Sequence, residues 1–307
     1  MAFQLSAKES VSDGITRNVR RQIEKALKHL GAKGKPSQRG VSQNEAVHEV
    51  RKCFKRVRAA LRLVREDLGD DVYREENWCF RDAARPLTEV RDAEVLVEIV
   101  DRLPQQFSGA IEPGALAKIR EALLANQQEV TRRVLDDGKA FAAVKEAAAR
   151  ARARLSNWRI ERTGWANLGS GIRRVYRRGH RAFALASENS SVENLHEWRK
   201  QAMYLWHQLQ LLEGVWTGSE KELVERTHQL STLLGEDHDL AVFRETLAAD
   251  PLAYGGHRIL KDLFAVIDRQ RQDLERRAFD LGQELYKDSP KAFTSRIESW
   301  MNYREVN

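Results

Sequence analysis

Residues that interrupt regular structure are scarce in this 307-residue sequence, which has 6 prolines and 18 glycines. That scarcity favours long helices over many short strands. Only two cysteines are present, Cys53 and Cys79, which excludes a disulfide framework and indicates a reducing, cytoplasmic setting. The sequence lacks an apolar run of about 18 residues, and its N-terminus lacks the pattern of a signal peptide. We therefore expect no membrane partner.

The residues that are abundant also favour helices. Hydrophobic residues make up 42% of the chain and charged residues 32%, enough to bury a core. Apolar residues recur at steps of three and four, as expected for the packed face of a helix. Helices are expected at roughly 13–31, 44–68, 72–101, 171–187, 192–213, 219–234 and 238–249, among others. Pro86 should kink the helix that contains it or start a new one. The sequence predicts an all-α fold.

Three sequence landmarks occur twice in the same order. His48-Glu49-Val50-Arg51-Lys52 returns as His196-Glu197-Trp198-Arg199-Lys200, and the segment around Arg91-Asp92 returns around His238-Asp239. Upstream, Gly14-Ile15-Thr16-Arg17 matches Gly171-Ile172-Arg173-Arg174. Such repetition indicates an internal duplication. It predicts two helical bundles, residues 1–138 and 139–307, related by a pseudo-twofold axis.

Positive charge is concentrated in two segments. Residues 14–65 contain 15 Lys or Arg against 3 Asp or Glu, and residues 150–181 contain 10 Arg against one acid. The whole chain has a net charge of +7, so the rest is net acidic. Segregated charge creates a positive field that attracts polyanions.

On a helical wheel, one row of basic residues lies beside the apolar face of helix 44–68. This row consists of His48, Arg51, Lys52, Lys55, Arg58 and Arg62. Arg17, Arg21 and Lys25 follow one face of the preceding helix, and Arg174 and Arg178 follow the corresponding face later. Like charges at this spacing repel each other, which indicates an anionic partner. Arg and Lys are the natural donors to phosphate oxygens.

The duplicated His-Glu-x-Arg-Lys motif, each time followed by Arg-Asp or His-Asp, resembles the conserved-histidine α-helical domain family, CHAD. The resemblance covers roughly residues 5–300. It implies two four-helix bundles and a central basic pore that binds inorganic polyphosphate, often at polyphosphate granules. We find no acidic Glu-x-Glu-x-Lys signature of the catalytic domain that accompanies some members. The resemblance therefore implies a stand-alone module.

The resemblance assigns polyphosphate contacts to both copies of the motif. In the first copy these are His48, Arg51, Lys52 and Lys55 with Arg17 and Arg21 from the preceding helix; in the second they are His196, Arg199 and Lys200. We predict that further basic residues on the same faces also contact polyphosphate: Lys25, Arg58, Arg62, Arg91, Arg174, Arg178 and His238. The second copy departs from the first, because Met203, Trp206 and Gln210 replace Lys55, Arg58 and Arg62. We expect an asymmetric pore. A histidine in place of Arg91 would also make that contact depend on pH.

Two other functions fit part of the pattern. A basic row would also hold a nucleic-acid backbone, although we find no motif for reading bases. The pair His238-Asp239 could belong to a metal-dependent phosphohydrolase, but its counterpart is Arg91-Asp92, and arginine is not a metal ligand. We expect a non-catalytic protein with no cofactor and no metal ion. Its oligomeric state is not indicated.

Overall fold

The computed structural model describes residues 2–31, 43–106, 113–161, 164–216 and 220–301. Within these ranges the chain forms helices and no strand, apart from one isolated bridge between Trp216 and Met301. The all-α fold class is confirmed. None of the described helices is long and apolar enough to cross a membrane.

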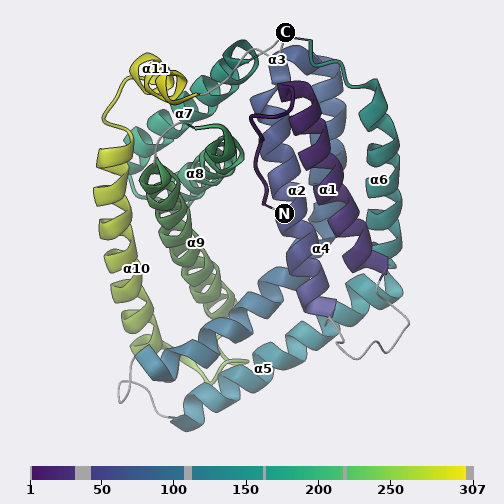
Figure 1. Ribbon diagram of the computed structural model, residues 1–307. Helices are drawn as coiled ribbons and strands as arrows, with labels where there is room; N and C mark the ends of the chain where they lie inside the picture. Colours follow the sequence, from purple (N-terminus) through teal and green to yellow (C-terminus); the bar gives the residue numbers. More distant parts are fainter. Residues whose placement is uncertain (1, 32–42, 107–112, 162–163, 217–219, 302–307) are drawn as a thin grey trace.

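The first group of helices packs around α2. It consists of α1 (Val11–Gly31), α2 (Gln43–Leu63), α3 (Arg65–Leu68), α4 (Asp70–Gln106), α5 (Pro113–Thr131) and α6 (Ala140–Arg154). Helix α2 lies between α1 and α4, α5 packs on α4, and α6 packs on α1 and α4. In Figure 1 the lower part of α4 and α5 extend beneath the other group.

The second group packs around α8 in the same order. It consists of α7 (Trp165–Glu188), α8 (Val192–Leu212), α9 (Lys221–Ala249), α10 (His257–Leu285) and α11 (Pro290–Trp300). Helix α8 lies between α7 and α9, α10 packs on α9, and α11 packs on α7. The duplication and the boundary between residues 138 and 139 stay predictions. Helix α6, which follows that boundary, packs with the first group.

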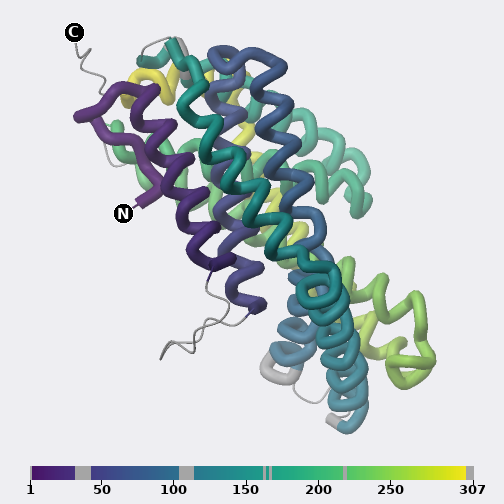
Figure 2. Tube along the Cα trace, turned by 90° about the vertical axis from the view of Figure 1, so that its right-hand side faces the viewer, coloured from purple at the N-terminus to yellow at the C-terminus, as the bar shows by residue number. Residues whose placement is uncertain are grey.

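The two groups meet where α2 packs on α8 and α4 packs on α9. At this junction the buried amide of Gln208 donates a hydrogen bond to the Ala59 carbonyl at 3.3 Å. The N-terminal segment adds a second tie, because the Leu5 amide donates to the Leu211 carbonyl at 2.8 Å. Figure 2, turned by 90°, shows the helices of both groups side by side in an elongated molecule. The junction thus holds residues far apart in the sequence in fixed positions.

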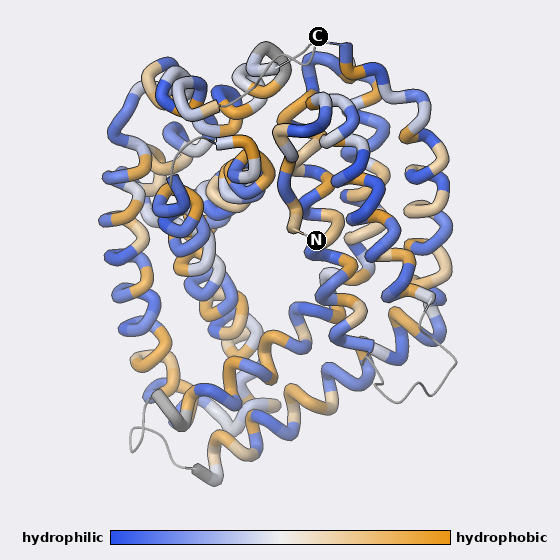
Figure 3. The backbone as a smooth tube through the Cα atoms, in the orientation of Figure 1, coloured by the Kyte–Doolittle hydropathy of each residue, from blue (hydrophilic) through white to orange (hydrophobic). Residues whose placement is uncertain are grey.

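The apolar face expected for helix 44–68 is the one that is buried. Its seven residues are all below a tenth exposed: Val47, Val50, Phe54, Val57, Leu61, Val64 and Leu68. Figure 3 shows hydrophobic and hydrophilic residues alternating along most helices, as one-sided burial requires. Trp158 and Trp198 are also buried, so they belong to the core.

Three helix boundaries differ from the expectation. The helix expected over 44–68 breaks at Val64, whose ψ of 22° leaves the α region, and α3 follows. Of the two alternatives at Pro86, a new helix is wrong, because α4 continues through it and the side chains of Leu87 and Val90 beyond it are buried; a kink at Pro86 stays a prediction. The two helices expected over 219–234 and 238–249 are one helix, α9, although residue 219 lies outside the described residues.

Candidate functional site

Three basic side chains from the two groups meet at the junction. Arg51 and Lys55 lie four residues apart on α2, so they point the same way, and Arg199 comes from α8. Each is half-buried. Burial, followed by the positive charges of Arg199 and Arg51, lowers the pKa of Lys55 to about 8. The structure therefore brings together basic residues from both copies of the repeated motif.

These three cations, which we call the junction cations, form no ion pair with an acid within the described part of the chain. Arg51 donates a hydrogen bond to the hydroxyl of Thr88 on α4. Asp92 and Asp239 act electrostatically on Arg51 and Arg199 but do not contact them. Burial raises the pKa of both carboxyls. Half-buried like charges without a paired acid are costly, so this arrangement favours an anionic ligand.

The other predicted cations are largely neutralised by neighbouring acids. Glu9 pairs with Arg17, and Glu66 pairs with Arg174. Lys25 and Lys52 share Glu49, and Lys200 pairs with Glu197. Arg91 contacts Glu94 at 2.6 Å and Glu98 at 2.8 Å. Among the described residues Arg21 and Arg178 form no ion pair; Arg21 is half-buried and Arg178 is exposed. The paired groups are less available to an anion than the junction cations.

The three predicted histidines are neutral at physiological pH. His48 is exposed on α2, while the rings of His196 and His238 lie 4.6 Å apart beside the junction. Burial lowers the pKa of His48 and of His196. Burial and the charge of Arg199 lower the pKa of His238 to about 3. From the sequence we expected the contact of His238, which stands in place of Arg91, to depend on pH. With so low a pKa, His238 does not change its charge near neutral pH in the free protein.

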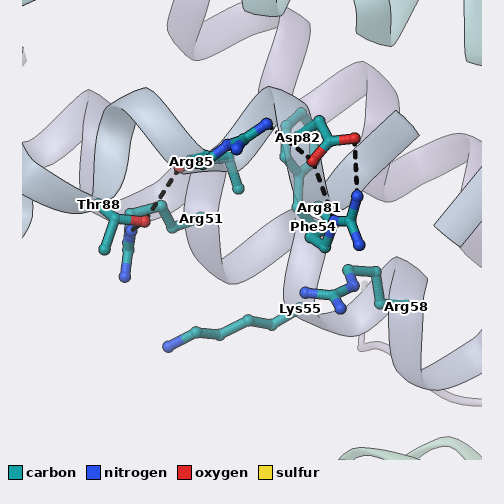
Figure 4. Close-up of a pocket in the computed structure, with 9 residues that line it drawn as sticks. Arg51, Phe54, Lys55, Arg58, Arg81, Asp82, Arg85 and Thr88 are labelled. Atoms are coloured by element: carbon teal, nitrogen blue, oxygen red, sulfur yellow. Dashed lines mark hydrogen bonds and ion pairs between the residues drawn. The ribbon is translucent and has the colours of Figure 1, made fainter. Parts of the chain in front are cut away.

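A cavity of about 520 Å³ extends from the junction between α2 and α4. Five cations line it: Arg51, Lys55 and Arg58 from α2, and Arg81 and Arg85 from α4. Figure 4 shows Lys55 extended, with its ammonium group away from the only lining carboxylate, that of Asp82. Asp82 contacts Arg81 at 3.0 Å and Arg85 at 3.2 Å. The cavity thus has a strong excess of positive charge.

Arg81 and Arg85 were not predicted from the sequence, from which only Arg91 of this helix was expected to bind the ligand. Their signal was available: Arg81, Arg85 and Thr88 follow steps of four and three and share one face of α4. Arg62, in contrast, does not line the cavity. Its guanidinium donates to Asn77 at 2.9 Å and lies 3.9 Å from the ring centre of Tyr204 on α8. It packs the two groups together.

No three His, Cys, Asp or Glu side chains in the described ranges lie close enough to hold a metal ion. The pair His238-Asp239 belongs to no such group. The ring of His238 lies tilted by 45° against that of His196, and Arg199 is the charge that acts most strongly on Asp239. The local chemistry at the junction is that of cations and neutral imidazoles, suited to holding phosphate oxygens.

Comparison with known proteins identifies relatives of this fold. The model of the CHAD domain family matches residues 21–248. The crystal structure of the CHAD domain from the plant Ricinus communis aligns with a TM-score of 0.51 at 14% identity, covering 97% of this chain and 95% of that one. PptA from Streptomyces chartreusis aligns with a TM-score of 0.61 at 14% identity, covering 91% and 100%. At this identity the two structures show the fold alone. No curated protein sequence matched this chain.

Proposed function

Because this chain belongs to the CHAD domain family, we propose that it binds inorganic polyphosphate at the junction of its two groups of helices and does no chemistry on it. The observation that carries the proposal is the set of junction cations, Arg51, Lys55 and Arg199. They are half-buried, act on one another, and lack paired acids among the described residues. A ligand with closely spaced negative charges relieves this repulsion.

The shape of the basic surface supports a linear ligand. Cations continue from the junction into the cavity between α2 and α4 through Arg58, Arg81 and Arg85. Polyphosphate offers one charge per unit and only oxygen acceptors, so a row of Arg and Lys suffices to hold it. A single-stranded nucleic acid usually needs stacking platforms as well. Of the aromatic rings, only Phe54 lines this cavity, and it is fully buried.

Binding without turnover is part of the proposal. Asp92 on α4 and Asp239 on α9 act electrostatically on each other and on Arg199, but the described residues hold no group of three carboxylates, histidines or cysteines of the kind that binds a divalent cation. The test is incubation of the protein with long-chain polyphosphate and Mg²⁺ or Mn²⁺. We expect no release of orthophosphate and no shortening of chains. Turnover that disappears in Asp92→Asn or Asp239→Asn would establish a phosphohydrolase instead.

The binding test is a titration with long-chain polyphosphate, tripolyphosphate, DNA, RNA and heparin at two salt concentrations. We expect long-chain polyphosphate to bind tightest, with log affinity falling linearly with log salt. It should bind much more tightly than tripolyphosphate, because adjacent contacts on one chain act at high effective concentration. Tighter binding of DNA or RNA than of polyphosphate would favour a nucleic-acid function and contradict the proposal.

A further inference from the structure

The cavity beside the junction belongs to the first group of helices, and its counterpart can be located in the second. Arg81 lies ten residues before Arg91 on α4, as His228 lies ten residues before His238 on α9. Counted in the same way, Thr232 corresponds to Arg85. The predicted duplication makes these pairs equivalent, and the packing supports it, because α4 contacts α2 as α9 contacts α8.

The equivalent place in the second group holds rings where the first group holds cations. Trp206 of α8 stands where Arg58 stands on α2. Its ring stacks on His207, with ring centres 4.3 Å apart, and on His228, with ring centres 4.0 Å apart. The interplanar angles of 27° and 19° are those of face-to-face stacking. Trp206 is half-buried, with neighbouring rings against both of its faces.

The equivalent positions of the second group also carry no positive charge of their own. Met203 and Thr232 are uncharged counterparts of Lys55 and Arg85. Burial, and then the charge of Lys52, lowers the pKa of His228, so this imidazole is neutral at pH 7.5. At these positions the second group therefore offers an anion fewer donors and less charge than the cavity of the first, and the cation that acts on His228, Lys52, belongs to α2.

We infer that a bound polyanion leaves the junction in one direction only, along the cavity between α2 and α4, with Arg81 and Arg85 as its outer contacts. This inference rests on the proposed function. The junction cations alone hold a short chain, and only a longer chain reaches the outer contacts. Arg81 and Arg85 thereby set the preference for long chains, whereas the stacked Trp206 and His228 close the opposite direction.

Two double variants with equal change in net charge test this inference. Arg81→Gln with Arg85→Gln removes two positive charges, and His228→Glu with Thr232→Glu adds two negative charges near pH 7.5. All four side chains are exposed, so both variants should fold, which circular dichroism verifies. A general effect of net charge would weaken binding equally in both. Affinities are measured for long-chain polyphosphate and for tripolyphosphate.

We expect the Arg81/Arg85 variant to bind long-chain polyphosphate on the order of tenfold more weakly and tripolyphosphate almost as well as wild type. The His228/Thr232 variant should change little for either ligand. Equal losses of long-chain affinity in both variants would show that net charge, or a ligand running in both directions, governs affinity and that Arg81 and Arg85 have no special role. No loss in either would confine it to the junction. Both results overturn the inference while leaving polyphosphate binding intact, whereas a wild-type protein that does not bind polyphosphate refutes the proposed function itself.

Discussion

Arg199 on α8 acts on Lys55 on α2 across the junction of the two groups of helices. Burial and the positive charge of Arg199 are the two largest causes that lower the pKa of Lys55 to about 8. These residues are far apart in the sequence: Arg199 lies in the second copy of the repeated motif, and Lys55 lies three residues beyond the end of the first copy. Their proximity shows that packing of α2 on α8 creates one shared basic centre.

Adjacent residues on α8 allow a matched test of that centre. Arg199 has no paired acid among the described residues, whereas its neighbour Lys200 pairs with Glu197. We expect Arg199→Gln to weaken polyphosphate binding by about 1.5–3 kcal/mol, the range for hydrogen bonds to charged groups. Lys200→Gln, with the same loss of charge, should cost well under 1 kcal/mol. Isothermal titration measures both. Equal losses would show that net charge, and not position, governs binding.

Polyphosphate affinity should fall as pH rises above about 8. The ammonium form of Lys55 binds the anion, and bound phosphate raises the pKa of this group above its free value of about 8. Affinity is therefore full below pH 8 and decreases as the free protein loses this proton. Lys55→Arg, which stays charged to pH 12, removes that decrease. Titrations at pH 7, 8 and 9 with both proteins measure the effect, and parallel pH profiles would contradict it.

Lys55→Met should stabilise the free protein and weaken its binding. Methionine is already present at the equivalent position, Met203. The unfolded chain keeps the Lys55 proton to about pH 10.4, whereas the folded protein releases it near pH 8. The free energy of unfolding of the wild type therefore rises between these pH values, and the variant lacks this rise. At pH 7 we expect a gain on the order of 1 kcal/mol, measured by urea unfolding. A lower free energy of unfolding of the variant at pH 7 would show that the charge of Lys55 does not destabilise the free protein.

Asp82→Asn should tighten binding of long-chain polyphosphate about threefold, because Asp82 competes with the ligand for Arg81 and Arg85. Asp71→Asn is the control. It lies on the same helix and makes the same change in net charge, but its carboxylate is fully exposed and 3.9 Å from Arg74. We expect the control to bind like wild type in the same titration. An equal gain in both variants would indicate a general charge effect.

The sequence by itself determined the helical fold and the location of its basic faces. Both depend on periods within one helix: the apolar steps from Val47 to Leu68 place the buried face, and the basic row from Arg51 to Arg58 follows beside it. The repeated motif also identified Arg199 as the counterpart of Arg51 in the second copy. Both properties depend only on the spacing of residues that are close in the sequence.

Only the tertiary structure decided which of these cations are available to a ligand. Glu49 on α2 neutralises Lys25 on α1, and Glu66 on α3 neutralises Arg174 on α7. Arg199 acts electrostatically on Lys55, and neither forms an ion pair with any residue that the structure describes. The same packing placed Arg81 in the cavity and its counterpart His228 against Trp206. Ion pairs and stacked rings between helices depend on how those helices are oriented, and no period within a single helix specifies that orientation.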